Sequence, residues 1–221
     1  MGVGRLTDLQ LRCLVVLAEM DPAWTLGGGG ALVGAYFGHR ETRDLDLFWN
    51  GRPFLGEVIP EVRRRLVAAG LAPVVLQSGP SHERLRLTAG GEVLVLDLIA
   101  EPNSSLELPG SLDLGSVRVA VDTAHELLVN KLCALLERSE LRDLDDVQVL
   151  LDGGGDLARA LGDAPRKDAG FSPLTLAWVL RHLPVRFLGD ASGYPPEAID
   201  RLAEVRGWLV AELVRLARVA D

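Results

Sequence analysis

Four consecutive glycines at positions 27–30 precede two aspartates, Asp44 and Asp46, that are separated by one leucine. A glycine turn at the start of a helix lets backbone N–H groups approach a phosphate closely, because no side chain intrudes and the helix N-terminus carries partial positive charge. Side chains alternate along a strand, so we expect Asp44 and Asp46 on one face. Paired carboxylates bind hard divalent cations, which bridge phosphate oxygens. Together the two motifs predict magnesium-dependent nucleotidyl transfer from a nucleoside triphosphate.

A third carboxylate, Asp97, lies within residues 93–99, the most apolar predicted strand of the chain. Burying a carboxylate is costly unless a cation or hydrogen bonds compensate it. We therefore expect Asp97 to face Asp44 and Asp46 across the sheet and to be the third ligand of the cation. The alternative is a surface-facing aspartate on an edge strand.

Further candidate residues follow in a strongly helical segment. Lys131 and Arg138 lie within about 20° of each other on one edge of its leucine stripe, so they could project two positive charges toward the sheet. Alternatively, both side chains extend past the leucines to solvent. Asp143 and Asp146 are three residues apart and share a helix face. The alternative for Asp146 is an ordinary surface ion pair with Arg142.

These candidates must be positioned by a strand-rich first half and a helical second half. The Gly90-Gly91 pair predicts an antiparallel hairpin, and residues 101–116 are predicted to be a loop. Helices are expected to follow residue 122, with a flexible linker at residues 152–155. The predicted strands span residues 23–26, 44–49, 73–77, 84–88, 93–99 and 117–121.

The composition excludes several classes of protein. The chain has 221 residues, enough for one large or two small domains with a real core. It has no apolar run long enough to span a membrane, and its N-terminus lacks the pattern of a secretory signal. Cys13 and Cys133 fall in apolar helical patterns, which predicts buried, reduced thiols and a cytoplasmic protein.

The net charge of −8 disfavours a surface that is basic throughout, although it is compatible with a local basic groove. The run Arg63–Arg65 covers most of the circumference of a predicted helix. We therefore interpret it as solvated surface rather than as a nucleic-acid contact.

Three motifs together resemble those of the AbiEii/AbiGii-type nucleotidyltransferases, which belong to the DNA polymerase β-like superfamily. The motifs are Gly28–Leu32, His39–Phe48 and Lys131–Asp146. The run His-Arg-x-Thr-x-Asp-Leu-Asp-Leu-Phe is the most specific of them. Members of this family are toxins of bacterial toxin–antitoxin and abortive-infection systems.

The resemblance implies an α+β fold, with a polymerase β-like mixed sheet and flanking helices followed by a C-terminal helical bundle. Residues 1–121 would form the nucleotidyltransferase core, and residues 122–221 a helical domain that completes the active site. Two Mg²⁺ ions are expected, with Mn²⁺ as a substitute. The implied reaction moves a nucleoside monophosphate from an NTP to RNA, most plausibly the tRNA 3′ end, with release of pyrophosphate. An antitoxin encoded nearby is an expected partner.

The resemblance also assigns roles to residues. Asp97 would help to activate the attacking hydroxyl, and Lys131 would contact the triphosphate. The implied metal ligands are Asp44, Asp46 and Asp97. The implied catalytic set is Asp44, Asp46, Asp97, Lys131 and Asp146. The implied substrate-binding set is Gly28, Gly29, Gly30, Arg43, Arg138, Arg142 and Asp143.

One position departs from the family pattern, because Gly30 replaces a usual Ser or Thr whose hydroxyl meets a phosphate. We expect weakened triphosphate binding as a result. Two alternative functions follow: an antibiotic-type enzyme that modifies a small molecule, and a catalytically inactive module that binds NTP or a partner protein. An RNA enzyme should show a basic groove past Arg138 and Arg142, whereas a small-molecule enzyme should show a closed acidic pocket.

Overall fold

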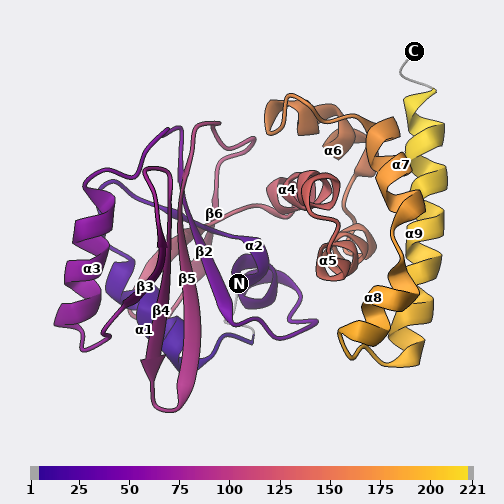
Figure 1. The fold of residues 1–221 in the computed structure, drawn as a ribbon. Helices are drawn as coiled ribbons and strands as arrows, with labels where there is room; N and C mark the ends of the chain where they lie inside the picture. The colour runs from indigo at the N-terminus through magenta and orange to yellow at the C-terminus, as the bar shows by residue number, and fades with distance from the viewer. Residues whose placement is uncertain (1–4, 219–221) are drawn as a thin grey trace. The chain divides into compact units, whose positions relative to one another are not determined.

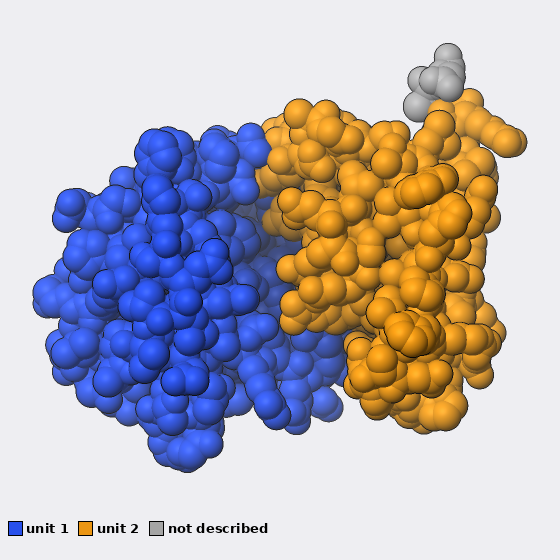
Figure 2. Space-filling model, viewed as in Figure 1, with its two compact units in different colours: residues 1–127 blue, residues 128–221 orange. Residues whose placement is uncertain are grey.

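The computed structural model describes residues 5–218. The chain divides into two compact units, residues 1–127 and residues 128–221, which Figure 2 draws in different colours. We refer to them as unit 1 and unit 2. The division falls after Leu127, within helix α4 (Ala124–Glu137).

Unit 1 is built on one mixed β-sheet. Within the described residues the sheet has seven strands, in the order β3-β4-β5-β2-β1-β7-β6 (Figure 1). β2 is parallel to β5 and β1 is parallel to β7, while the other neighbouring pairs are antiparallel. The strands are β1 (Thr25–Gly27), β2 (Asp44–Asn50), β3 (Val74–Ser78), β4 (His82–Ala89), β5 (Glu92–Glu101), β6 (Gly110–Asp113) and β7 (Arg118–Val121).

Helices α1 (Asp8–Leu17) and α3 (Val58–Ala68) cover one face of this sheet (Figure 1). α1 begins at a capping box, in which the Thr7 hydroxyl accepts from the Gln10 backbone N–H and the Gln10 side chain accepts from the Thr7 backbone N–H. Such a box satisfies two donors that the helix start would otherwise leave unpaired.

The strand alternation separates a core face from a polar face. Leu45, Leu47 and Trp49 of β2 are buried, whereas Asp44 and Asp46 are partly exposed. Period-two geometry accounts for this division, because successive side chains of a strand point to opposite faces. The acidic pair therefore lies on the face opposite α1 and α3.

The glycine run leaves the sheet directly at the end of β1. It forms a one-turn helix, α2 (Gly28–Ala31), that continues as a π-helical turn, η1 (Leu32–Tyr36). The predicted helix after the glycines is present, but its second half has the wider π-helical hydrogen-bond pattern.

Unit 2 is helical throughout its regular structure in the described chain. After the remainder of α4 come α5 (Leu141–Asp152), α6 (Leu157–Asp163), the 3₁₀ turn η2 (Ala164–Arg166), α7 (Pro173–His182), α8 (Val185–Ala191) and α9 (Pro196–Ala217). Among the glycines after α5, Gly155 is closely packed, since a Cβ there would lie 2.8 Å from the Leu150 carbonyl oxygen, whereas a Cβ at Gly154 would meet nothing within 4 Å.

The predicted α+β fold is confirmed as a mixed sheet with flanking helices, followed in the chain by helices. The prediction of a loop over residues 101–116 is wrong in part, because β6 forms there at the edge of the sheet. Both cysteines lie in the described part of the chain and neither forms a disulfide; Cys13 is buried, while Cys133 is only partly so. No helix among residues 5–218 has the length and apolarity to cross a membrane.

Candidate active site

Four residues form a row across the polar face of the sheet. Gly27 of β1 pairs with Asp46 of β2, and Asp46 pairs in turn with Asp97 of β5. Asp97 also pairs with Arg84 of β4. Directly opposite residues on neighbouring strands share a face. The structure therefore brings Asp46 and Asp97 side by side as predicted, with Asp44 two residues earlier on the same face.

The glycine turn lies against the Asp46 carboxylate. Gly28 has φ +56°, in the left-handed region that favours glycine, and a Cβ there would lie 1.9 Å from Asp46 Oδ2. A Cβ at Gly29 would lie 2.9 Å from an Nη2 atom of Arg40. Gly28 and Gly29 are both partly exposed. A carboxylate, an arginine and accessible backbone thus converge at this turn.

Gly30 lies in a different environment from its two neighbours. It is buried, and a Cβ there would lie 2.9 Å from Leu45 Cδ2 and 3.3 Å from Leu26 Cδ1. A side chain at this position would therefore begin among apolar core atoms. The residue whose missing side chain faces the carboxylates is Gly28.

Asp97 is 3% exposed, and its strand β5 lies between β4 and β2. The alternative of a surface-facing aspartate on an edge strand is therefore wrong. His82 Nε2 lies 2.7 Å from Asp97 Oδ1. Arg84 donates from Nη2 to Oδ2 at 2.9 Å and from Nε to Oδ1 at 3.0 Å. The cation that compensates for the burial is thus an arginine, where we had expected a metal ion.

The carboxylates differ in how well they suit a divalent cation. Asp44 and Asp46 are partly exposed oxygen donors on one face, which suits a hard cation such as Mg²⁺. Both oxygens of Asp97 are instead held by Arg84 and His82. Within residues 5–218 no group of three or more His, Cys, Asp and Glu side chains is arranged to hold a metal ion. The residues fit a cation held by the Asp44–Asp46 pair but not a preformed three-carboxylate centre.

Arg84 interacts electrostatically with all three aspartates of this face. Its hydrogen bonds to Asp97 raise the pKa of the guanidinium above its usual value, and the charges of Asp44 and Asp46 act in the same direction. The Arg84 side chain is 45% exposed even so. One side of this cation is therefore fixed, while the other is open to solvent and to anionic ligands.

Unit 2 contains a second cluster of acidic and basic side chains. Lys131 of α4 lies 2.8 Å from Asp143 Oδ1 and 2.7 Å from Asp146 Oδ2. Arg138, directly after the end of α4, donates from Nε to Asp143 Oδ2 at 2.8 Å. Both aspartates are fully buried and the Lys131 side chain is 8% exposed. Lys131 and Arg138 share Asp143 as a partner, although Arg138 lies in the turn after α4. The surface ion pair proposed for Asp146 is wrong because Asp146 is buried.

The charges in this cluster have a measurable consequence for Asp143. Burial alone would raise its pKa, but the hydrogen bond from Arg138 and the attraction of Lys131 outweigh burial and hold the pKa below the ordinary 3.8. Arg142 has a different environment, since it pairs with Glu140 on the surface and its side chain is 43% exposed. Lys131, Arg138, Asp143 and Asp146 thus lie together, while Arg142 pairs outside the buried group.

The sequence model of the AbiEii nucleotidyl transferase toxin, from type IV toxin–antitoxin systems, matches residues 10–172 of the chain. The match spans most of the sequence and contains every residue of both clusters. The chain belongs to the AbiEii nucleotidyltransferase family. It is therefore a nucleotidyltransferase by family, and the predicted resemblance is confirmed.

Two solved structures superpose on this AbiEii-family chain and have a similar fold. The protein JHP933 from Helicobacter pylori superposes with a TM-score of 0.58 at 16% sequence identity, over 96% of this chain and 94% of that one. A candidate nucleotidyltransferase from H. pylori superposes with a TM-score of 0.55 at 16% identity, over 96% and 99% of the two chains. No curated protein matches the sequence. At these identities the structural likeness shows the fold alone.

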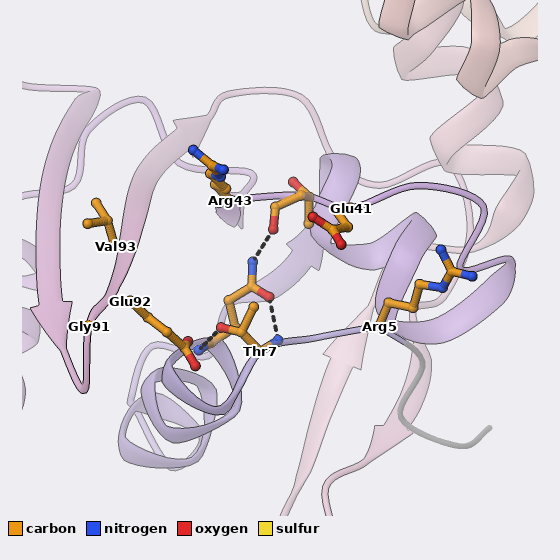
Figure 3. Close-up of a pocket in the computed structure, with 9 residues that line it drawn as sticks. Arg5, Thr7, Glu41, Arg43, Gly91, Glu92 and Val93 are labelled. Carbon is orange, nitrogen blue, oxygen red and sulfur yellow. Dashed lines mark hydrogen bonds between the residues drawn. The ribbon is translucent and has the colours of Figure 1, made fainter. Parts of the chain in front are cut away.

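Arg43, which the family resemblance assigned to substrate binding, lines a pocket of about 540 Å³ at the start of β2 and β5 (Figure 3). Gln10 also lines this pocket, and its side chain donates to the Thr42 carbonyl at 2.9 Å. This bond anchors the segment that leads into the acidic strand. The pocket lining includes Arg43 but neither Asp44 nor Asp46, so Arg43 contributes to a neighbouring surface.

The structure adds residues that sequence reasoning missed. Arg84 and His82 hold Asp97, and Arg40 lies over the glycine turn. Asp122, which is 4% exposed, lies against Gly27, where a Cβ would be 2.7 Å from its Oδ2. The signal for Arg84 was present in the chain: a two-residue turn at Gly90-Gly91 fixes a hairpin register that sets Arg84 opposite Asp97.

Proposed function

We propose that the protein transfers a nucleoside monophosphate from an NTP to an RNA acceptor, the 3′ end of tRNA, as the toxin of a toxin–antitoxin pair. The single observation that carries the proposal is the contact between the glycine turn at Gly28 and the Asp46 carboxylate, beside Asp44 on the same strand face. A phosphate-binding turn and a cation-binding pair can act on the same triphosphate only when they lie this close together.

In unit 1, different residues would bind the metal ion and the phosphates of an NTP. Asp44 and Asp46 would hold Mg²⁺, and the bound ion would neutralise charge that develops on the phosphate oxygens. Gly28 and Gly29 are partly exposed, and the lack of a side chain lets Asp46 and Arg40 lie directly against this turn, where its backbone would bind the phosphates. Arg40, beside Gly29, adds a guanidinium that can bind phosphate with two parallel hydrogen bonds. Lys131 as a further triphosphate contact stays a prediction from the family.

A polyanionic acceptor is supported by the basic side chains around the acidic strand. Arg43 and Arg84 are exposed and Arg40 is partly exposed, although the whole chain carries a net charge of −8. Local basic residues of this kind attract phosphate backbones even where the overall charge is negative. The family description further supports a protein antitoxin as partner.

The proposal is tested by incubating the protein with Mg²⁺, total RNA and each α-³²P-labelled NTP in turn. We expect label in tRNA with the parent chain and at least 1,000-fold less with Asp46→Asn, because the variant loses a charged cation ligand but keeps its shape. The matched control is Asp113→Asn, an equally conservative change on the exposed β6–β7 hairpin of the same unit. It should label tRNA at the parent rate.

Two other results would redirect the proposal. Transfer to an aminoglycoside or other small hydroxyl compound, with no label in RNA, would establish the antibiotic-type alternative. Thermal stabilisation by Mg²⁺ and NTP without transfer to any acceptor would establish a binding module.

A further inference from the structure

Asp97 is the expected third metal ligand, yet its surroundings suit a different task. Three hydrogen-bonding atoms surround its carboxylate: Nε2 of His82, and Nε and Nη2 of Arg84, all within 3.0 Å. A planar guanidinium that binds both oxygens of a carboxylate forms the strongest class of ion-paired hydrogen bond in proteins. A metal ion at Asp97 would have to displace it.

The position of Arg84 is set by the backbone and not by chance contact of two long side chains. β4 and β5 pair without a register shift from His82↔Ile99 to Ala89↔Glu92, so Arg84 is directly opposite Asp97. Asp97 in turn is opposite Asp46. The cation therefore lies on the second strand from the acidic strand, on the same face.

The pairing also orients Arg84 for a ligand. One edge of the guanidinium is bound to Asp97, while the side chain remains 45% exposed. Asp97 is directly opposite both Arg84 and Asp46, so the cation and the proposed cation-binding pair are on neighbouring positions of one face. In keeping with this register, the charges of Asp44 and Asp46 raise the pKa of Arg84. A group bound at Asp44 and Asp46 that carries further negative charge would meet Arg84 next.

We propose that Asp97 is a positioning residue that fixes Arg84 on the face of the sheet, and that Arg84 binds the triphosphate of the incoming NTP. Metal binding is then a property of Asp44 and Asp46 without Asp97. This inference rests on the proposed function, since it assigns a residue to the NTP of that reaction. It departs from the expected role of Asp97 as a ligand and as the group that activates the attacking hydroxyl.

The first test measures metal binding without turnover, by Mn²⁺ electron paramagnetic resonance on the full chain. The key variant is the double change Arg84→Gln with Asp97→Asn, which removes a cation and an anion together and leaves the net charge of the face unchanged. We expect its Mn²⁺ dissociation constant to stay within threefold of the parent value. Asp46→Asn should raise that constant at least tenfold. Comparable weakening in the double variant would overturn the proposal, because Asp97 would then be a ligand.

The second test measures the affinity for inorganic tripolyphosphate by calorimetry in EDTA, so that no metal contributes. Arg84→Gln should weaken binding at least fivefold, and Arg84→Lys should recover part of it, because lysine keeps the charge but not the fork. Asp97→Asn should weaken binding although Arg84 is intact. A single cooperative unfolding transition above the assay temperature would establish that these variants are folded.

Unchanged tripolyphosphate affinity in a folded Arg84→Gln variant would overturn the assignment of Arg84. Both measurements are made without an acceptor. A chain that bound tripolyphosphate through Arg84 but transferred nothing to RNA would contradict the proposed function and leave this inference standing.

Discussion

Unit 1 and unit 2 each pair buried aspartates with basic side chains, but the main basic partner is exposed to a different degree in the two units. We call Asp44, Asp46, Arg84 and Asp97 the open cluster, and Lys131, Arg138, Asp143 and Asp146 the enclosed cluster. In unit 1, Asp97 is buried but its partner Arg84 is 45% exposed. In unit 2, Asp143 and Asp146 are fully buried and their partner Lys131 is 8% exposed. A cation open to solvent on one side can exchange part of its hydration for a ligand, whereas an enclosed cation is committed to its carboxylates.

This difference in exposure indicates that the enclosed cluster contributes mainly to stability and the open cluster mainly to ligand binding. The enclosed cluster joins α4 to α5, because Lys131 comes from α4 and Asp143 and Asp146 come from α5. Arg138, in the turn after α4, bonds Asp143 from the rim of the cluster with its side chain 46% exposed. Two cations and two carboxylates in contact leave no net charge to be buried. The open cluster instead has a half-exposed arginine, Arg84, bound to Asp97 on the sheet face that carries Asp44 and Asp46. We therefore expect substitutions in unit 2 to change stability most, and substitutions in unit 1 to change ligand binding most.

The largest effect on stability is expected from Lys131→Met. It leaves Asp146 without its lysine in a buried position, and breaking a buried pair in this way typically costs about 3–5 kcal/mol. The same measurement on Arg84→Gln should show about half that loss, because His82 still bonds Asp97 and water can replace an exposed guanidinium. Urea unfolding followed by circular dichroism measures both. Equal losses would remove the contrast between an open and an enclosed cluster.

The next largest effect is expected from Gly28→Ala, which distinguishes the contact between this glycine and Asp46 from the strain of a left-handed backbone. Gly28→Ala introduces a Cβ 1.9 Å from Asp46 Oδ2, at φ +56°. The matched control is Gly56→Ala, at φ +53° with nothing within 4 Å of its Cβ. Both variants should lose about 1–2 kcal/mol of stability from the left-handed backbone.

Only Gly28→Ala should also displace Asp46 and lower transfer about 100-fold, the scale expected for a misplaced catalytic group. Labelled transfer to RNA and urea unfolding, measured on the same preparations, separate the two effects. If Gly56→Ala reduced transfer equally, strain and not the contact with Asp46 would explain the loss.

Much of unit 1 could be predicted because its signals are local. Alternation placed Asp44 and Asp46 on one face and Leu45 on the other. The two-residue turn at Gly90 and Gly91, both with positive φ, even determines the pairing of β4 with β5. The partner of Asp97 could therefore have been read from the chain by counting from that turn.

The other features of the fold and of the site depend largely on contacts between residues that are distant in sequence. The parallel register between Asp46 and Asp97 joins strands separated by a helix and a hairpin, and no turn residue specifies it. β6 was missed because an edge strand that begins at Gly110 has little apolar alternation to reveal it. In unit 2, the burial of Asp143 and Asp146 depends on how α5 packs against α4. Helix periodicity alone placed these two aspartates on a common face but did not distinguish core from solvent.

A smaller effect on stability is expected when the pH is lowered, because the buried Asp143 of the enclosed cluster then loses its charge. The pKa of Asp143 is held below 3.8 in the folded chain, so the folded state binds this proton less readily than the unfolded state does. The stabilisation is therefore complete above pH 3.8 and is lost as the pH falls through the lowered folded value. We expect the stability difference between the parent and Asp143→Asn to shrink as the pH is lowered from 5 to 2.5, at no more than about 1.4 kcal/mol per pH unit. Thermal unfolding across this range measures it, and a constant difference would contradict the ion-pair explanation.

The smallest effect on stability is expected from Arg142→Ala, which makes it the most direct test of a binding role in unit 2. Arg142 and its partner Glu140 are both about two-fifths exposed, and such pairs contribute about 0–1 kcal/mol. A change in urea stability below about 0.5 kcal/mol should therefore accompany the substitution. If Arg142 binds the RNA acceptor, as the family resemblance implies, the KM for tRNA rises while the KM for NTP and the stability stay at parent values. If both KM values are unchanged, Arg142 is an ordinary surface residue, and substrate contacts must be sought among the arginines beside Asp44 and Asp46.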